Sequence, residues 1–389
     1  MNSIEITVIL LLLFMTVPDL CRRIQRPALT YAVFTGVGLL LWPVADSEVA
    51  AMLRGAGNLG FLLLLFEVGL EIDLPRWQDF RPALAFALPW ASLQFPLILL
   101  LAHFAGLNLV ESLVAAAALT GCSVGMAHLA WQHHPSLSDL ERPFVLRVMV
   151  TLEMLTIVLL AVGGPALKDG LRWTLLLKLA GLAVVIILVA RAARQVMRLF
   201  DAILQRATHW RTHLLVVLVL AICALGERLG LSAPKTAFFL GLFTSRVEHD
   251  GKGLDEFMAP VSHRFLIPLF FVSLGMTIQW PMLASWPALL ALGTAGLLLG
   301  LRQVLERRWF KLGAAPDTFL LLCPNLTVVA LAASALMQRE GRTGSATWLL
   351  LTGLFLTVAA VLLLPASKAS DAGSPDTPTE PAPAAETNP

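Results

Sequence analysis

Long apolar runs follow one another along almost the whole of this chain, separated by short stretches that contain proline, glycine or charged residues. A helix that crosses a membrane needs about 20 mostly apolar residues, because it must span the hydrocarbon layer at about 1.5 Å per residue. The sequence holds 57% hydrophobic and 14% charged residues, whereas a soluble domain carries about 25% charged residues. The pattern therefore predicts an all-α polytopic membrane protein.

Division of the chain at these interruptions predicts about thirteen membrane-spanning helices, which together form one transmembrane domain over residues 1–365. The predicted spans are 5–20, 27–44, 50–72, 82–104, 109–131, 142–163, 171–193, 212–230, 235–245, 258–278, 284–304, 316–338 and 345–364. Residues 366–389 contain no bulky apolar side chain. Such a segment cannot bury enough surface to fold, so we expect a disordered cytoplasmic tail.

Two predicted spans are interrupted near their middles. Thr120–Gly125 combines glycine with short polar side chains, and Cys323–Thr327 contains Pro324, which lacks a backbone donor. Irregular backbone survives in a bilayer only where it is buried in protein or lines a cavity. Interrupted spans in the two halves of a chain are typical of transporters built from inverted repeats, with the binding site at the breaks. Alternatively, the glycines serve only close helix packing and the proline only kinks its helix.

Ionisable side chains at bilayer depth are expected to be functional. Glu153 follows Arg142 by about 16 Å of helix, which places its carboxylate near mid-membrane. Burial disfavours the charged form of a carboxylate, which suits a group that exchanges a proton for a cation. A neutral or ion-paired structural glutamate is the alternative. Arg302 lies toward one end of the span 284–304, where it could also extend to the membrane interface.

Other chemistry is absent from the sequence. The four cysteines (Cys21, Cys122, Cys223 and Cys323) are far apart and show no metal-binding spacing. There is no phosphate-binding glycine loop, nucleophile elbow or HExxH motif. The basic stretch Arg191–Arg211 is explained as a cytoplasmic loop. We therefore expect neither an enzyme, nor a cofactor, nor a nucleic-acid partner.

Three segments carry a family resemblance, and they occur in the family's order. They are LGFLLLLFEVGLEID at 59–73, LGLS at 229–232 with AFFLG at 237–241, and IPLFFVSLGM at 267–276. The chain resembles the monovalent cation:proton antiporter-2 family over essentially its whole length without the tail. The resemblance implies a homodimer in which each subunit has a dimerisation part and a moving core, with the two broken helices crossing in the core.

The resemblance also implies site residues. The ion-binding carboxylate of the family, usually an aspartate after a polar residue, falls on Glu153, which here follows Leu152. The basic residue of the eleventh span, usually lysine, falls on or next to Arg302, and the crossover matches Thr120–Ser123. The expected ion- and proton-binding residues are Glu153, Thr120, Cys122, Ser123, Asn325 and Arg302, with Glu153 as the ligand of a monovalent cation.

These features predict exchange of Na⁺ or K⁺ for protons across the inner membrane by alternating access. Glutamate in place of aspartate, and Leu152 in place of a polar residue, leave two alternatives open. One is a transport-inactive membrane scaffold or sensor with the antiporter fold. The other is a transporter of another small solute.

The distribution of basic residues predicts the orientation in the membrane. If the loop after the first span is cytoplasmic, 19 of the 28 lysine and arginine residues face the cytoplasm and 6 face outward. Cytoplasmic loops carry an excess of these residues, so we expect the N-terminus outside and the C-terminus in the cytoplasm. A cysteine introduced after Ala366 should therefore react with an impermeant maleimide only from the cytoplasmic side. Labelling from outside would contradict the thirteen-span arrangement.

Overall fold

The structure is a computed structural model. It describes residues 3–365 apart from 25, 27–28, 72–76, 133, 170–199, 201–209, 229–232, 246–247, 250–251, 279 and 338. The predicted span 171–193 and the predicted tail 366–389 lie outside the described residues.

The regular secondary structure of the described residues is helical except for one pair of two-residue strands. The helices of the first part are α1 (Ser3–Arg23), α2 (Leu29–Leu41), α3 (Ser47–Glu71), α4 (Trp77–Phe104), α5 (Leu109–Thr120), α6 (Val124–Gln132) and α7 (Arg142–Asp169). Those of the second part are α9 (Arg211–Arg228), α10 (Ala233–Thr244), α11 (Leu254–Val261), η1 (Ser262–Leu266), α12 (Ile267–Gly275), α13 (Trp280–Leu283), α14 (Trp286–Arg308), η2 (Thr318–Leu322), α15 (Leu326–Met337) and α16 (Thr343–Leu363). The strands β1 (Glu248–His249) and β2 (Lys252–Gly253) pair antiparallel.

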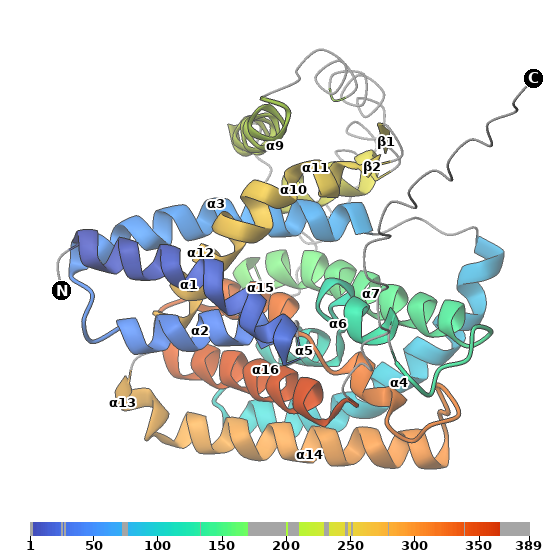
Figure 1. Cartoon of the computed structure of the whole chain (residues 1–389). Coiled ribbons are helices and arrows are strands. Elements are labelled where there is room, and N and C mark those ends of the chain that lie inside the picture. The colour runs from blue at the N-terminus through green and yellow to red at the C-terminus, as the bar shows by residue number, and fades with distance from the viewer. Residues whose placement is uncertain are drawn as a thin grey trace, which may run out of the picture.

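Eight helical stretches in the described residues are long and apolar enough to cross a membrane, which confirms a multi-pass membrane protein. The apolar helices α2 and α5 are shorter. α9 covers the predicted span 212–230 but is not among the eight. Figure 1 views α9 nearly end-on, whereas it shows α3 and α14 from the side, so α9 runs across their direction. The count of thirteen therefore stays a prediction.

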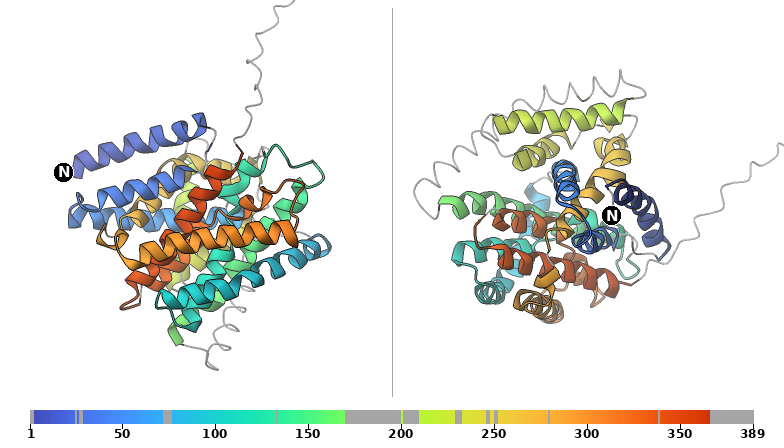
Figure 2. Two further views of the ribbon diagram at one scale, coloured as in Figure 1. Left: turned by 90° about the horizontal axis from the view of Figure 1, so that it is seen from below. Right: turned by 90° about the vertical axis from the view of Figure 1, so that its left-hand side faces the viewer.

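The helices form two groups that pack against each other. In the first helix group, α3 packs against α10, α11 and α12, and α2 against α1 and α12. In the second helix group, α5 packs against α4, α7 and α15, and α16 against α14 and α15. Figures 1 and 2 show α3 and α10 on one side of the molecule and α14 on the opposite side. The groups meet where α3 contacts α6 and α2 contacts α16.

Glycines allow the helices of the first group to approach closely. A Cβ atom at Gly38 of α2 would lie 1.9 Å from the carbonyl oxygen of Val272, and one at Gly275 of α12 would lie 1.9 Å from that of Thr35. Lipid tails are as apolar as leucine, so helices in a bilayer associate through such close packing rather than through a hydrophobic driving force. The α2–α12 contact is therefore a contact between backbones.

Both predicted interruptions are confirmed, and they contact each other. α5 ends at Thr120, the backbone at Gly121 is extended (φ −67°, ψ 164°), and α6 begins at Val124. The other broken span runs from η2 through residues 323–325 to α15. Where they meet, the backbone N–H of Ser123 donates a hydrogen bond of 2.7 Å to the carbonyl oxygen of Pro324. The glycine and proline interruptions thus form the crossing, the place where the two broken spans contact each other, and do more than allow close packing or a kink.

The two broken spans run antiparallel, as their outer ends show. The carboxylate of Glu111, in the first turn of α5, pairs with Arg339 at 2.7 Å and Arg342 at 3.0 Å, which follow the end of α15. At the opposite end, His134 after α6 lies 4.0 Å from Asp317, which precedes η2. Burial lowers the pKa of His134, so this second contact is ionic only when the pH is low enough to protonate the ring.

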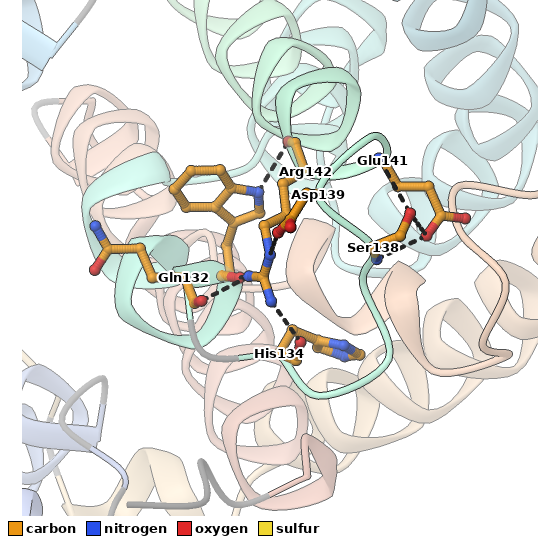
Figure 3. Close-up of polar contacts among 7 residues, drawn as sticks. Gln132, His134, Ser138, Asp139, Glu141 and Arg142 are labelled. Atoms are coloured by element: carbon orange, nitrogen blue, oxygen red, sulfur yellow. Dashed lines mark hydrogen bonds and ion pairs between the residues drawn. The ribbon is translucent and has the colours of Figure 1, made fainter. Parts of the chain in front are cut away.

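The C-terminus of α6 is closed by an arginine from the next helix (Figure 3). The guanidinium of Arg142 donates to the carbonyl oxygens of Trp131 at 2.7 Å, Gln132 at 2.6 Å and His134 at 3.0 Å. A cation at a helix C-terminus pairs the last carbonyl groups and interacts favourably with the helix dipole. Arg142 thereby fixes α6 to the start of α7, the helix that carries Glu153.

The close contact between α2 and α12 can be tested with two neighbouring glycines. Gly38→Ala should destabilise the protein by about 1–3 kcal/mol, the usual cost of overpacking, because its Cβ would meet the backbone of α12. Gly36→Ala is the matched control, since no atom lies within 4 Å of a Cβ there. Thermal unfolding of the purified variants in detergent measures the difference. Equal melting temperatures would contradict the backbone contact.

Candidate ion- and proton-binding site

The crossing places four helix ends in the interior of the second helix group. The C-terminal ends of α5 and η2 carry carbonyl groups without helical partners, and the N-terminal ends of α6 and α15 carry N–H groups without them. These ends act as partial charges of about −0.5 and +0.5. Backbone groups in the interior of a membrane protein must be paired within the protein. Side chains whose charge is opposite to the partial charge of each helix end are therefore expected beside these ends.

Arg302 of α14 pairs with carbonyl groups at the C-terminal ends of α5 and η2. Its guanidinium donates to the carbonyl oxygen of Leu119 near the end of α5 and, at 3.4 Å, to that of Leu322 at the end of η2. Nε donates to Oε1 of Gln94 at 2.8 Å. The side chain is fully buried at 0% exposure, so the alternative that it extends to the interface is wrong. Its positive charge compensates both C-termini.

Glu153 of α7 accepts a hydrogen bond at the N-terminal end of α6. Oε2 accepts a hydrogen bond of 2.9 Å from the backbone N–H of Val124, the first residue of that half-helix. Glu153 is 1% exposed. The N–H group and the helix dipole both stabilise a carboxylate at this place. The carboxylate of Glu153 therefore lies where the N-terminus of α6 favours a negative charge.

Asn325 ties the two breaks together. Its Nδ2 donates to the carbonyl oxygen of Leu119 at 3.1 Å, and its backbone N–H donates to Oγ1 of Thr357 at 3.2 Å. Oδ1 of Asn325 is buried and has no hydrogen-bond partner among the described residues. The carbonyl of Leu119 thus receives donors from both Asn325 and Arg302.

The remaining predicted residues lie at the first break and are buried. The hydroxyl of Thr120 donates to Ala116, one turn earlier in its own helix, at 2.8 Å. The thiol of Cys122 donates to the carbonyl oxygen of Leu321 at 3.3 Å. Ser123 contributes its backbone N–H to the crossing. All six predicted residues therefore lie at or beside the crossing, but the Thr120 hydroxyl is directed to its own helix.

Residues that the sequence reasoning missed complete the surroundings of the crossing. Gln94 of α4 is fully buried and holds Arg302. Thr156 of α7 donates to the carbonyl oxygen of Ala117 at 3.2 Å, and a Cβ at Gly121 would lie 2.6 Å from its Oγ1. A polar residue within an apolar run was the signal that could have found both of them.

A cavity adjoins Glu153 between the two helix groups. It is lined by residues of α3, α7 and α15, namely Leu64, Leu65, Glu153, Ile157, Thr327, Val328 and Leu331. Among the described residues, no group of three or more histidine, cysteine, aspartate or glutamate side chains could hold a metal ion.

Known proteins resemble this chain in sequence and in fold. The probable Na⁺/H⁺ antiporter 3 of Methanocaldococcus jannaschii is 24% identical over 281 residues, which cover 69% of this chain and 70% of that protein. The Na⁺/H⁺-K⁺ antiporter GerN of Bacillus cereus is 24% identical over 270 residues, covering 67% and 68%. The structure of the sodium proton antiporter MjNhaP1 from M. jannaschii matches with a TM-score of 0.63 at 16% identity, over 93% of this chain and 98% of that one. It shares this fold.

The family assignment rests on most of the sequence. Residues 8–368 match the family described as sodium/hydrogen exchanger, transmembrane. The matched region contains every helix of the described structure except the first residues of α1. The chain therefore belongs to the sodium/hydrogen exchanger family of membrane transporters.

Proposed function

We propose that this protein exchanges a monovalent cation, Na⁺ or K⁺, for protons by alternating access. The observation that carries the proposal is the buried carboxylate of Glu153, which is held on the α6 N-terminus beside a cavity between the two helix groups. Two of the relatives are named as a Na⁺/H⁺ antiporter and a Na⁺/H⁺-K⁺ antiporter, which supports the same exchange.

In this mechanism the proton and the cation compete for one carboxylate. Protonated Glu153 is neutral and requires no counter-ion, whereas ionised Glu153 is compensated by the cation. Arg302 is paired with the two helix C-termini, and in the proposed mechanism this pairing is the same in both states. Because binding of the cation requires loss of the proton, the apparent cation affinity weakens as the pH falls, by up to about tenfold per pH unit below the pKa.

Alternating access requires movement of the second helix group past the first. The two broken spans are tied at one end by Glu111 with Arg339 and Arg342, and Arg142 ties α6 to α7, which supports movement as a unit. The cavity beside Glu153 is bounded on the opposite side by Leu64 and Leu65 of α3.

We further propose a homodimer in the cell inner membrane, with the N-terminus outside and residues 366–389 as a cytoplasmic tail.

One observation favours a second candidate, a transport-inactive scaffold or sensor with this fold. Leu152, the residue before Glu153, is buried and apolar, so a second polar ligand is missing at the place where the antiporter-2 resemblance leads us to expect one. Fewer ligands weaken a cation site. An intact fold without exchange would then remain useful only through partner proteins.

Glu153→Gln tests the function directly. Glutamine keeps the size and much of the hydrogen bonding but cannot release a proton, so we expect cation-dependent proton flux in proteoliposomes to fall to the level of empty liposomes. Glu153→Asp should retain exchange. Glu48→Gln is the matched control, because Glu48 is exposed at the start of α3, and its flux should equal that of the unmodified protein. Sodium, potassium and lithium are each added as the driving ion.

Two results would contradict the proposal in different ways. Exchange by Glu153→Gln at the unmodified rate would show that the site is elsewhere. A folded, unmodified protein that shows no flux with any of the three ions but binds a partner protein would favour the scaffold.

A further inference from the structure

Thr327 is a buried polar residue whose hydroxyl forms no hydrogen bond within its helix or at the crossing, among the described residues. It is the second residue of α15 and is 6% exposed. Its hydroxyl oxygen is buried and has no hydrogen-bond partner among the described residues. A buried hydroxyl without a partner costs about 1–3 kcal/mol, so its presence requires an explanation.

The break before α15 explains why this hydroxyl is not used within the helix. Seven buried threonines in other helices donate to the carbonyl oxygen four residues earlier, namely Thr35, Thr120, Thr151, Thr244, Thr294, Thr347 and Thr352. For Thr327 that position is Cys323, which lies in the interruption between η2 and α15 rather than in a helix. The interruption therefore leaves the hydroxyl available for another ligand.

The cavity beside Glu153 supplies the place for that ligand. Glu153 and Thr327 both line it, and the other lining residues are apolar side chains of leucine, isoleucine and valine. A cation that leaves water for such a cavity needs oxygen atoms to replace its hydration shell. Glu153 supplies a charged oxygen, and the Thr327 hydroxyl supplies a neutral one with two lone pairs.

We propose that Oγ1 of Thr327 is a ligand of the bound cation and contributes to the choice among Li⁺, Na⁺ and K⁺. The inference deepens the proposed function, because it rests on Glu153 binding the cation. A neutral ligand stabilises the bound cation and has no proton to exchange. Loss of the hydroxyl therefore raises the KM for the cation and leaves the maximal rate of exchange nearly unchanged, which distinguishes Thr327 from Glu153.

Thr327→Val tests this inference, because valine has nearly the same shape but no oxygen. We expect the apparent Na⁺ affinity to fall at least about tenfold, the usual effect of losing one contact to a charged group. Thr327→Ser keeps the oxygen and should stay within about twofold of the unmodified protein. Thr244→Val is the matched control, since the Thr244 hydroxyl donates to Leu240 within α10, away from the cavity.

Two measurements keep the inference separate from the proposed function. Purified protein is titrated with NaCl against choline chloride at alkaline pH, with thermal stabilisation as the readout of binding, and the KM for Na⁺ is measured in proteoliposomes. A protein that binds Na⁺ without exchanging it would overturn the proposed function, and the binding series would still decide the role of Thr327. Affinity of Thr327→Val equal to that of the unmodified protein would overturn the inference alone.

The remaining outcomes are also decisive. If the unmodified protein neither binds nor exchanges Li⁺, Na⁺ or K⁺, both the function and the ligand assignment are wrong. If Thr327→Val does not fold, Thr327→Cys supplies the comparison, because sulfur is a soft ligand that disfavours Na⁺ relative to Tl⁺. An unchanged ratio of Na⁺ to Tl⁺ affinity in Thr327→Cys would then overturn the inference.

Discussion

The architecture of this protein depends on one constraint, that backbone polar groups in hydrocarbon must be paired within the protein. Two interrupted spans violate the simplest solution, a continuous helix, and so create four buried helix ends. The side chains placed there pair with backbone groups at these helix ends. Arg302 pairs carbonyls of α5 and η2, Glu153 accepts from the first N–H of α6, and Asn325 joins the breaks.

The same compensation creates the candidate site. A carboxylate alone in hydrocarbon would be costly to ionise. At the N-terminus of α6 it receives an N–H donor and a favourable helix dipole, both of which stabilise a negative charge. Arg302, which is held by two carbonyl groups and Gln94, keeps its charge on the C-termini. The crossing thereby holds a positive and a negative side chain on different helix ends.

The two helix groups differ in how they are held together. The first group relies on glycines that bring backbones into contact, as at Gly38 and Gly275. The second group relies on buried polar bonds around the crossing and on ion pairs at its end, such as Glu111 with Arg339. Polar bonds fix the geometry of a site within one group. Leu64 and Leu65 of the first group line the cavity beside Glu153 with apolar side chains, which suits the movement between the groups that we propose.

The sequence by itself determined the membrane class, most of the helix positions and both interruptions, because hydrophobicity, proline, glycine and residue spacing act locally along a chain. Only the tertiary structure decided what the breaks are for. Arg302 and Leu119 are 183 positions apart, and no local pattern records that they meet. The contact of Gln94 with Arg302 and the place of Thr327 at the cavity were likewise decided there, since sequence alone does not show which helix end or cavity a lone polar residue in an apolar run faces.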